Sequence, residues 1–179
     1  MAFEFNTPAG ETIARELLIA YLNTGTAASP VWSPLGNRTT DSSEEYDWSR
    51  ESSQDILGKT RTRMKKPVVT QTFDPWELDG GDAAAEKIHQ LAVIEQNAQA
   101  LCNLDMMIAH FYVESNGRNF AERYSACSIE TTNLGGEGGG SIGMPITVTY
   151  GGERTTGTVS KGVDGTVTYT PDGAGGVEE

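Results

Sequence analysis

The sequence contains no long hydrophobic run, no basic stretch at its start and no closely spaced pair of cysteines. No segment approaches the roughly 20 apolar residues that a membrane-spanning helix needs. The opening residues, MAFEFNTPAGE, have neither the basic nor the apolar region of a secretory signal. We therefore expect a soluble protein that folds in a cytoplasm. Its two cysteines, Cys102 and Cys127, are expected to be buried free thiols because they form no C-x-x-C motif.

Basic residues are also scarce. The 179 residues include 13 Lys and Arg against 25 Asp and Glu, which gives a net charge of −12. A protein that grips nucleic acid needs a basic surface, so this balance argues against that class. The balance is compatible with a surface past which nucleic acid moves without sticking. The length suggests one domain with a sizeable core.

The most cofactor-like motif is a glycine run. Gly138, Gly140 and Gly143 fit the spacing G-x-G-x-x-G of a dinucleotide-binding turn. Such a turn must open a helix, whereas Gly143 is followed by MPITVTY, a strand-like stretch that contains a proline. We therefore interpret the glycines as positions where a loop bends or where two backbones approach closely.

A calcium loop is matched only in part. Glu77, Asp79, Gly80 and Glu86 stand at its third, fifth, sixth and twelfth places, but Pro75 stands at the first place. A proline supplies no side-chain oxygen, so we interpret this segment as a turn that leads into a capped helix.

The histidines and tryptophans do not form a recognisable site either. His89 and His110 have no second histidine or cysteine at ligand spacing, so packing roles are expected. Trp32, Trp48 and Trp76 are candidates for core residues or interface anchors. No G-x-S-x-G motif occurs. The sequence therefore predicts no catalytic residue, no cofactor and no metal site.

Charge is unusually patterned over residues 41–74. Residues 41–55 carry six acids and one base, whereas residues 59–66 carry five bases and no acid. Bases alternate with Thr60, Thr62 and Met64, which predicts a strand. We expect a long hairpin in which an acidic strand faces a basic strand, with the turn near Leu57-Gly58.

A hairpin this long and polar is hard to explain inside a monomer, because isolated hairpins are marginal in water. A solvated face is the simpler interpretation, and a surface for a partner is the sharper one. The residues that we expect at a subunit or ring interface are Glu44, Glu45, Asp47, Glu51, Lys59, Arg61, Arg63 and Lys65.

One helix is predicted over about residues 82–97. Asp82 can cap its start, and Ala84, Ile88, Leu91 and Ala92 recur at helical spacing. Asn97 is the expected end. Strand-like segments make up most of the remainder: LLIAYL at 17–22, PVWSPLGN at 30–37, LDMMIAHFYV at 104–113, RNFAERYSACSIETTN at 118–133, the alternating run at 142–150, ERTTGTVS at 153–160 and TVTYT at 166–170.

The C-terminal part predicts one specific connection. Gly151-Gly152 can form a tight two-residue hairpin turn, so residues 153–160 are expected to pair with residues 142–150. LDMMIAHFYV is apolar on both faces, as in a central strand. The Gly-rich acidic tail at 171–179 is expected to be disordered.

The order of these segments over about residues 12–160 resembles the major tail (tail tube) protein of long-tailed bacteriophages. The resemblance is carried by W-S-P-L-G, the charged hairpin, DPWELDGGDAAAEKIHQLAVIEQNAQAL, the apolar strand and SACSIETTNLGGEGGGSIGMPITVTYGGERTTGTVS. It implies a mainly β, sandwich- or barrel-type tail-tube fold over residues 1–170, with one flanking helix and the hairpin as an arm.

The same resemblance implies a structural role without enzymatic activity. Copies would form hexameric rings that stack into a hollow tube around a tape-measure protein, and DNA would later pass through the lumen. Tail terminator and tail-tip proteins would be further partners. The protein would be synthesised in the host bacterial cytoplasm and become part of the virion.

Three alternatives remain open at this level. The first is the inner tube of a contractile tail or of a phage-like bacteriocin. The second is a monomeric β-sandwich that binds carbohydrate or another surface ligand, and the third is an enzyme, for which the sequence offers no constellation of residues.

Overall fold

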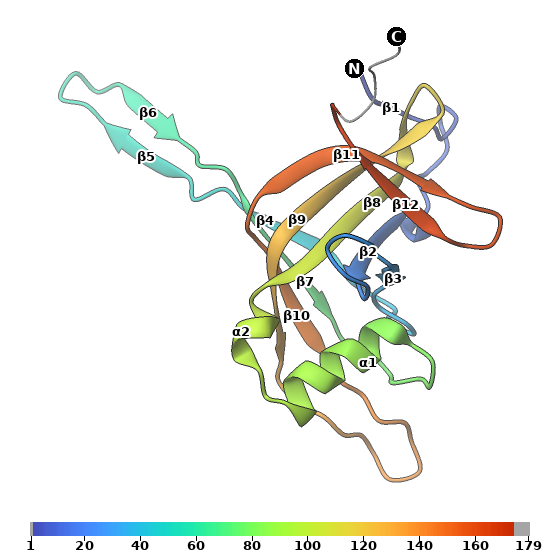
Figure 1. Cartoon of the computed structure of the whole chain (residues 1–179). Helices are drawn as coiled ribbons and strands as arrows, with labels where there is room; N and C mark the ends of the chain where they lie inside the picture. The colour runs from blue at the N-terminus through green and yellow to red at the C-terminus, as the bar shows by residue number, and fades with distance from the viewer. Residues whose placement is uncertain (1, 174–179) are drawn as a thin grey trace.

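A computed structural model describes residues 2–173, and it is mainly β (Figure 1). The strands are β1 Glu4–Phe5, β2 Leu18–Asn23, β3 Trp32–Pro34, β4 Glu44–Asp47, β5 Glu51–Gln54, β6 Thr60–Arg63, β7 Val68–Phe73, β8 Leu104–Ser115, β9 Arg118–Thr131, β10 Ile146–Tyr150, β11 Arg154–Lys161 and β12 Val167–Pro171. The helical segments are η1 Arg15–Leu17, α1 Ala83–His89, η2 Gln90–Ile94 and α2 Ala98–Leu101.

Two antiparallel sheets share the long strand β9. Sheet A has the order β3-β2-β8-β9-β11-β12, and β1 adds to β8 near its end. Sheet B has the order β9-β10-β7-β4, where the last residues of β9 pair with β10. The mainly β, sandwich-like fold with one principal flanking helix is confirmed.

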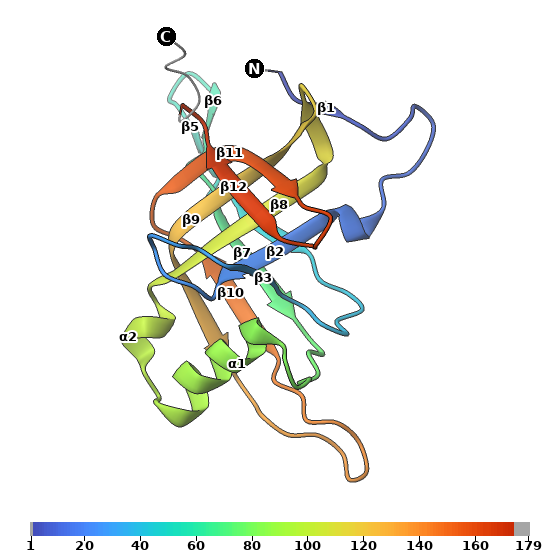
Figure 2. The same ribbon diagram turned by 45° about the vertical axis from the view of Figure 1, so that its right-hand side comes forward.

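Two apolar cores lie on the opposite faces of sheet A. Met106 and Ile108 of β8 point into the core between the sheets and α1, where Trp76 and Ile88 are also buried. Met107 alternates with them and points into the second core, over which β12 folds (Figure 2). Because successive strand residues face opposite sides, β8 must be apolar on both faces, as predicted.

The helix begins where predicted but ends early. The Asp82 carboxylate accepts a hydrogen bond from Ala85 N at 3.2 Å and caps α1. After His89 the helix widens into the π-helical segment η2, and Gln96 adopts a positive φ of 49° that reverses the chain. The prediction that Asn97 ends the helix is wrong, because its side chain caps α2 through Ala100 N at 3.0 Å.

The predicted turn at Gly151-Gly152 is also wrong. β10 pairs with β9 and β7, whereas β11 pairs with β9 and β12. These glycines instead carry the chain from sheet B to sheet A close over Ala126. A Cβ on Gly152 would lie 2.6 Å from Ala126 N, which only glycine avoids. The strands β10 and β11 therefore pair with successive parts of the same long strand, β9.

Two smaller expectations differ from the structure. Cys127 is buried, but Cys102 is exposed because it lies in the turn after α2. Within the segment expected to be disordered, Pro171 belongs to β12 and Asp172 accepts a hydrogen bond from Thr156 Oγ1 at 2.6 Å. Residues 174–179 of that segment lie outside the described residues. Across residues 2–173, no helix has the length and apolar character needed to cross a membrane.

Candidate assembly surface

The charged segment forms an arm that projects from the body (Figure 1). β4 and β7 form its base, and β5 and β6 form the free hairpin beyond the sheets. The turn lies where predicted, because Asp55 Oδ1 accepts hydrogen bonds from Leu57 N and Lys59 N, both at 2.9 Å. Gly58 has a φ of 77°, which suits glycine.

The expected pairing of an acidic strand with a basic strand is wrong. Glu44, Glu45 and Asp47 lie in β4, which pairs with the uncharged residues 68–71 of β7. Across the free hairpin, Glu51 lies opposite Arg63. The turn at 55–59 sets this register, so the basic run faces residues 48–55, where few acids occur. Acids and bases are therefore separated along the arm.

Among the eight residues predicted at an interface, the structure brings together one ion pair. Glu51 Oε1 lies 3.9 Å from Lys65 Nζ, and both side chains are more than 70% exposed. An exposed pair of this kind contributes about 0–1 kcal/mol. Lys59, Arg61 and Arg63 of the free hairpin are exposed and make no ion pair within residues 2–173.

The free hairpin has two different faces. Arg61 and Arg63 share one face with Glu51 and Ser53 of the facing strand. Thr60, Thr62 and Met64 share the other face with Ser52 and Gln54, and the hydroxyls of Ser52 and Thr62 lie 3.1 Å apart. The period-2 pattern of the sequence thus yields one basic face and one uncharged face.

Large apolar side chains are exposed along the arm. Ile56 and Leu57 at the tip have relative exposures of 102% and 76%. Tyr46 and Trp48 stack near the base with ring centroids 6.4 Å apart, and Trp48 is also exposed. Apolar groups held in water at the end of a hairpin are typical of a surface that a partner covers.

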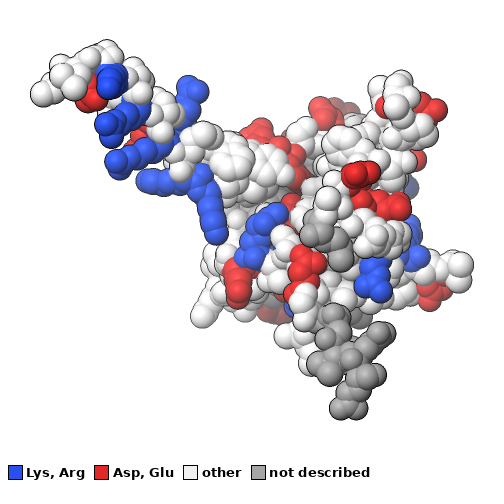
Figure 3. Space-filling view, turned by 90° about the horizontal axis from the view of Figure 1, so that it is seen from above, with Lys and Arg blue, Asp and Glu red and all other residues white. Residues whose placement is uncertain are grey.

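The outer part of the arm, residues 48–66, differs in charge from the rest of the chain. Residues 48–66 contain two acids and six bases, the latter being Arg50, Lys59, Arg61, Arg63, Lys65 and Lys66, for a net charge of +4. The other 160 residues hold seven Lys and Arg against 23 Asp and Glu, for a net charge of −16. Figure 3 shows the Lys and Arg side chains clustered along the arm.

A half-buried carboxyl group, that of Glu44, lies at the base of the arm. Glu44 Oε2 accepts a hydrogen bond from the Tyr46 hydroxyl at 2.7 Å, while its other oxygen is buried without a hydrogen-bond partner among the described residues. Burial raises the pKa of Glu44, and the hydrogen bond from Tyr46 opposes this shift. This environment was not visible in the sequence, where Glu44 is one of several acids.

Glu44 faces a buried polar cluster that sequence reasoning missed. Glu122 of β9 lies 3.0 Å from His110 Nε2 and accepts hydrogen bonds from Tyr124 and Arg154. Burial raises the pKa of Glu122, but these partners outweigh burial and hold it below its usual value. His110 therefore has a packing role, as predicted, in a charged setting. A weak signal was available in the glutamate and histidine among apolar neighbours.

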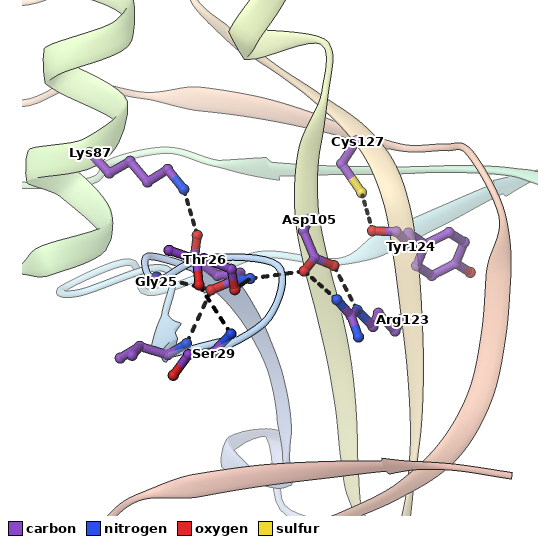
Figure 4. Close-up of polar contacts among 10 residues, drawn as sticks. Gly25, Thr26, Ser29, Lys87, Asp105, Arg123, Tyr124 and Cys127 are labelled. Atoms are coloured by element: carbon purple, nitrogen blue, oxygen red, sulfur yellow. Dashed lines mark hydrogen bonds and ion pairs between the residues drawn. The ribbon is translucent and has the colours of Figure 1, made fainter. Parts of the chain in front are cut away.

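A second polar network fixes the loop between β2 and β3 (Figure 4). Arg123 donates two hydrogen bonds to Asp105, at 2.8 and 2.7 Å. Asp105 accepts another from Asn23, whose side-chain oxygen in turn accepts from Gly25 N and Val31 N. Lys87 Nζ of α1 donates to the Asn23 carbonyl at 2.6 Å. These bonds tie α1, β2, β8 and β9 together.

The motifs discounted in the sequence have structural roles. Gly143 pairs with Gly135 and leads into β10 rather than into a helix, which confirms the interpretation of the glycine run as a bending loop. Within the segment that partly matches a calcium loop, Arg38 forms ion pairs with Glu77 at 3.1 Å and with Asp79 at 3.4 Å. Trp32 and Trp76 are core residues.

No protein-family model matches this sequence, and neither does any curated protein. A chain in the cryo-EM structure of the anti-feeding prophage tube-terminating cap is 14% identical, with a TM-score of 0.49. That match covers 86% of this chain and 95% of the other. A chain in the sheath–tube complex of the extracellular contractile injection system PVC is 11% identical, with a TM-score of 0.48 and coverages of 84% and 95%.

A chain in the sheath/tube terminator of the same PVC system is also 11% identical, with a TM-score of 0.49 and coverages of 83% and 99%. These particles differ in kind from the long-tailed phages that the sequence resemblance implied. Identities and TM-scores this low do not assign the chain to a family or to a function.

Proposed function

We propose that this chain is the structural subunit of a phage-tail-type tube, built by self-assembly of many copies. The outer part of the arm carries the proposal: residues 48–66, with exposed apolar side chains and a net charge of +4, project from a chain that is otherwise strongly acidic. Such an arm has a complementary surface on every other copy of the chain. Charge complementarity of this kind sets register and speeds encounter.

In this proposal the outward face of sheet B lines the lumen. Its side chains are carboxylates, hydroxyls and one exposed valine, and no Lys or Arg stands among them: Glu45, Asp47, Val68, Thr70, Thr72, Ser128, Glu130, Thr147 and Thr149. A polar wall of negative charge repels phosphates and lets DNA slide without binding.

The sheet edges suggest how copies join. Among the described residues, β4 at the edge of sheet B pairs only with β7, so one side of its backbone is open. Three acids in this short strand discourage uncontrolled pairing. Joining such edges around a ring would close the sheets of six copies into one barrel and remove the open edges.

The assembly then follows the plan implied by the resemblance. Hexameric rings stack around a tape-measure protein, terminator and tail-tip proteins close the two ends, and the chain becomes part of the particle. The proposal includes no catalytic step. It covers both the tube of a long-tailed phage and the inner tube of a contractile particle, and a sheath gene beside this gene would distinguish the second.

Negative-stain electron microscopy of the concentrated protein, with sedimentation velocity on the same sample, tests the proposal. We expect hollow rods or six-fold rings. A monomer at all concentrations, both alone and after addition of a co-expressed tail-tip complex, would overturn it.

A further inference from the structure

A hollow of about 1070 Å³ opens in the body, and its size is that of a pocket for a large ligand. Leu18, Leu35 and Phe73 contribute apolar surface to it. In Figure 1 the arm leaves the body on the left, whereas β2, β3 and the chain at 35–42, which line the hollow, lie on the right. The free hairpin therefore points away from the hollow, whereas β7 at the base of the arm contributes Gln71 and Phe73 to the lining.

The lining of the hollow is acidic. Its ionisable residues are Glu16, Asp41, Asp79, Asp82 and a single base, Arg15. Arg15 is turned toward the chain, because its guanidinium donates to the carbonyls of Ser42 and Leu18. Glu16 and Asp41 are exposed and make no ion pair within residues 2–173. The hollow thus offers two solvated carboxylates beside an apolar surface.

The end of the arm has the opposite character. Ile56 and Leu57 are the most exposed large apolar residues of the hairpin, and Lys59, Arg61 and Arg63 follow within six residues on β6 and its approach. Apolar anchors flanked by cations match an apolar floor flanked by anions. Burying the anchors would supply affinity, and the rim charges would select orientation.

We infer that the end of the arm of one copy docks in this hollow of a second copy, with Ile56 and Leu57 on the apolar floor and the bases of β6 beside Glu16 and Asp41. The contact is heterologous, and repeated contacts of this type build rings or open-ended stacks. The inference rests on the proposed tube function, for which it names the receiving surface.

Directed cross-linking tests the contact itself. Both partners carry Cys102→Ser to remove the exposed native thiol. Leu57→Cys protein is mixed with Thr40→Cys protein, since Thr40 lines the hollow, and is oxidised with diamide. The matched control replaces the second partner by Glu137→Cys, which lies in the exposed glycine loop. Peptide mass spectrometry then identifies the linked residues.

A specific contact holds two thiols at an effective concentration of about a millimolar, so the 57–40 yield should exceed the 57–137 yield at least about tenfold. Equal yields in samples that form rods or rings would overturn the docking site and leave the tube function standing. Equal yields together with a monomer that never assembles would overturn both.

Charge reversal provides a second readout that needs no cysteine. Arg61→Glu/Arg63→Glu and Glu16→Lys/Asp41→Lys should each weaken self-association at least about tenfold, because like charges then meet. Mixing the two variants should restore association between them. Ile56→Asp should also weaken it, whereas Val163→Asp, at an equally exposed site in the β11–β12 turn, should not.

Besides the acidic hollow of a second copy, a basic arm can also bind nucleic acid, which is a polyanion. A short labelled DNA duplex is titrated into the unchanged protein and into Arg61→Glu/Arg63→Glu at physiological salt. We expect no arm-dependent binding at concentrations where the protein self-associates. DNA binding that is lost in this variant, without any effect of Glu16→Lys/Asp41→Lys on self-association, would overturn the inference.

Discussion

The carboxylate of Glu122 lies 3.0 Å from Nε2 of His110, and both side chains are buried. Tyr124 and Arg154 complete the hydrogen bonding of this carboxylate. Glu122 and His110 lie on the face of sheet A that is turned toward sheet B. Burial raises the pKa of Glu44, which lies in β4 of sheet B. The pKa of Glu122 in the body is therefore lowered, whereas the pKa of Glu44 at the base of the arm is raised.

Glu122→Gln should destabilise the protein at pH 7 by about 3 kcal/mol, because it leaves His110 and Arg154 without their charged partner. The folded pKa of Glu122 is lowered, so its contribution is present above its usual pKa and is lost as pH falls through the lowered value. Urea unfolding at pH 7 and in acid measures both effects. The control is Glu130→Gln on the exposed face of the same strand, and equal losses in the two variants would contradict the prediction.

Glu44→Gln should change stability in the opposite direction, toward a more stable protein at neutral pH. Burial raises the folded pKa of Glu44, so the contribution of Glu44 to stability is full below its ordinary pKa and is lost as pH rises through the raised pKa. The amide removes this loss and can still accept from Tyr46. We expect the variant to gain stability over the unchanged protein as pH rises from 4 to 7. Glu45→Gln, on the outward face, should show no such trend, and parallel pH curves for all three proteins would refute the explanation.

Arg123→Lys should lower stability by about 1.5 kcal/mol although it keeps the charge. Arg123 contacts Asp105 with two nitrogens, at 2.8 and 2.7 Å, and lies over the Trp32 ring with Cζ 5.5 Å from its centroid. An ammonium group cannot reproduce this fork or stack in the same way. Thermal unfolding beside the control Arg118→Lys measures the loss. An unchanged midpoint would show that the network contributes little.

Removal of the free hairpin should leave a folded protein that does not assemble. Lys65 N donates to Trp48 O at 3.0 Å, so residues 49–64 can be replaced by Asn-Gly in a two-residue turn. β4 and its Tyr46 remain in place in this variant. Circular dichroism reports the fold, and sedimentation with electron microscopy reports assembly. Normal rods from this variant would rule out a necessary role for the arm.

The two cysteines should differ sharply in reactivity. Cys102 is exposed, whereas burial raises the pKa of Cys127 to about 12. Because the thiolate is the nucleophile, iodoacetamide at pH 8 should modify Cys102 alone in the folded protein and both residues in urea. Mass spectrometry of the two peptides measures this. Rapid labelling of Cys127 in the folded state would contradict the packing described for β9.

Several elements could be predicted because their causes are local. Asp82 caps α1 with its own side chain, β8 is apolar at the four buried positions from Met106 to Ala109, and bases alternate with threonines in β6. Each pattern depends on a few neighbouring residues and a known period. The hairpin of the arm could be predicted for the same reason, because a long polar run with a turn near Leu57-Gly58 is a local pattern.

The errors have non-local causes. Gly151-Gly152 has the composition of a hairpin turn, but the length of β9 lets two strands pair with it in succession, so the glycines cross above Ala126. The acidic and basic runs were expected to face each other. Register instead places the acids of β4 opposite uncharged residues of β7 and places Arg61 opposite Ser53, because a shift of a few residues in the turn decides every pair beyond it.

By itself the sequence determined that the chain is acidic, mainly β and equipped with a charged arm, since composition and short-range periodicity carry that information. Only the tertiary structure decided that the arm is basic beyond an acidic base, that the half-buried Glu44 and the buried Glu122 have opposite pKa shifts, and that an acidic hollow opens away from the free hairpin. These features depend on which distant residues meet, and such meetings are set by strand pairing and burial rather than by neighbours along the chain.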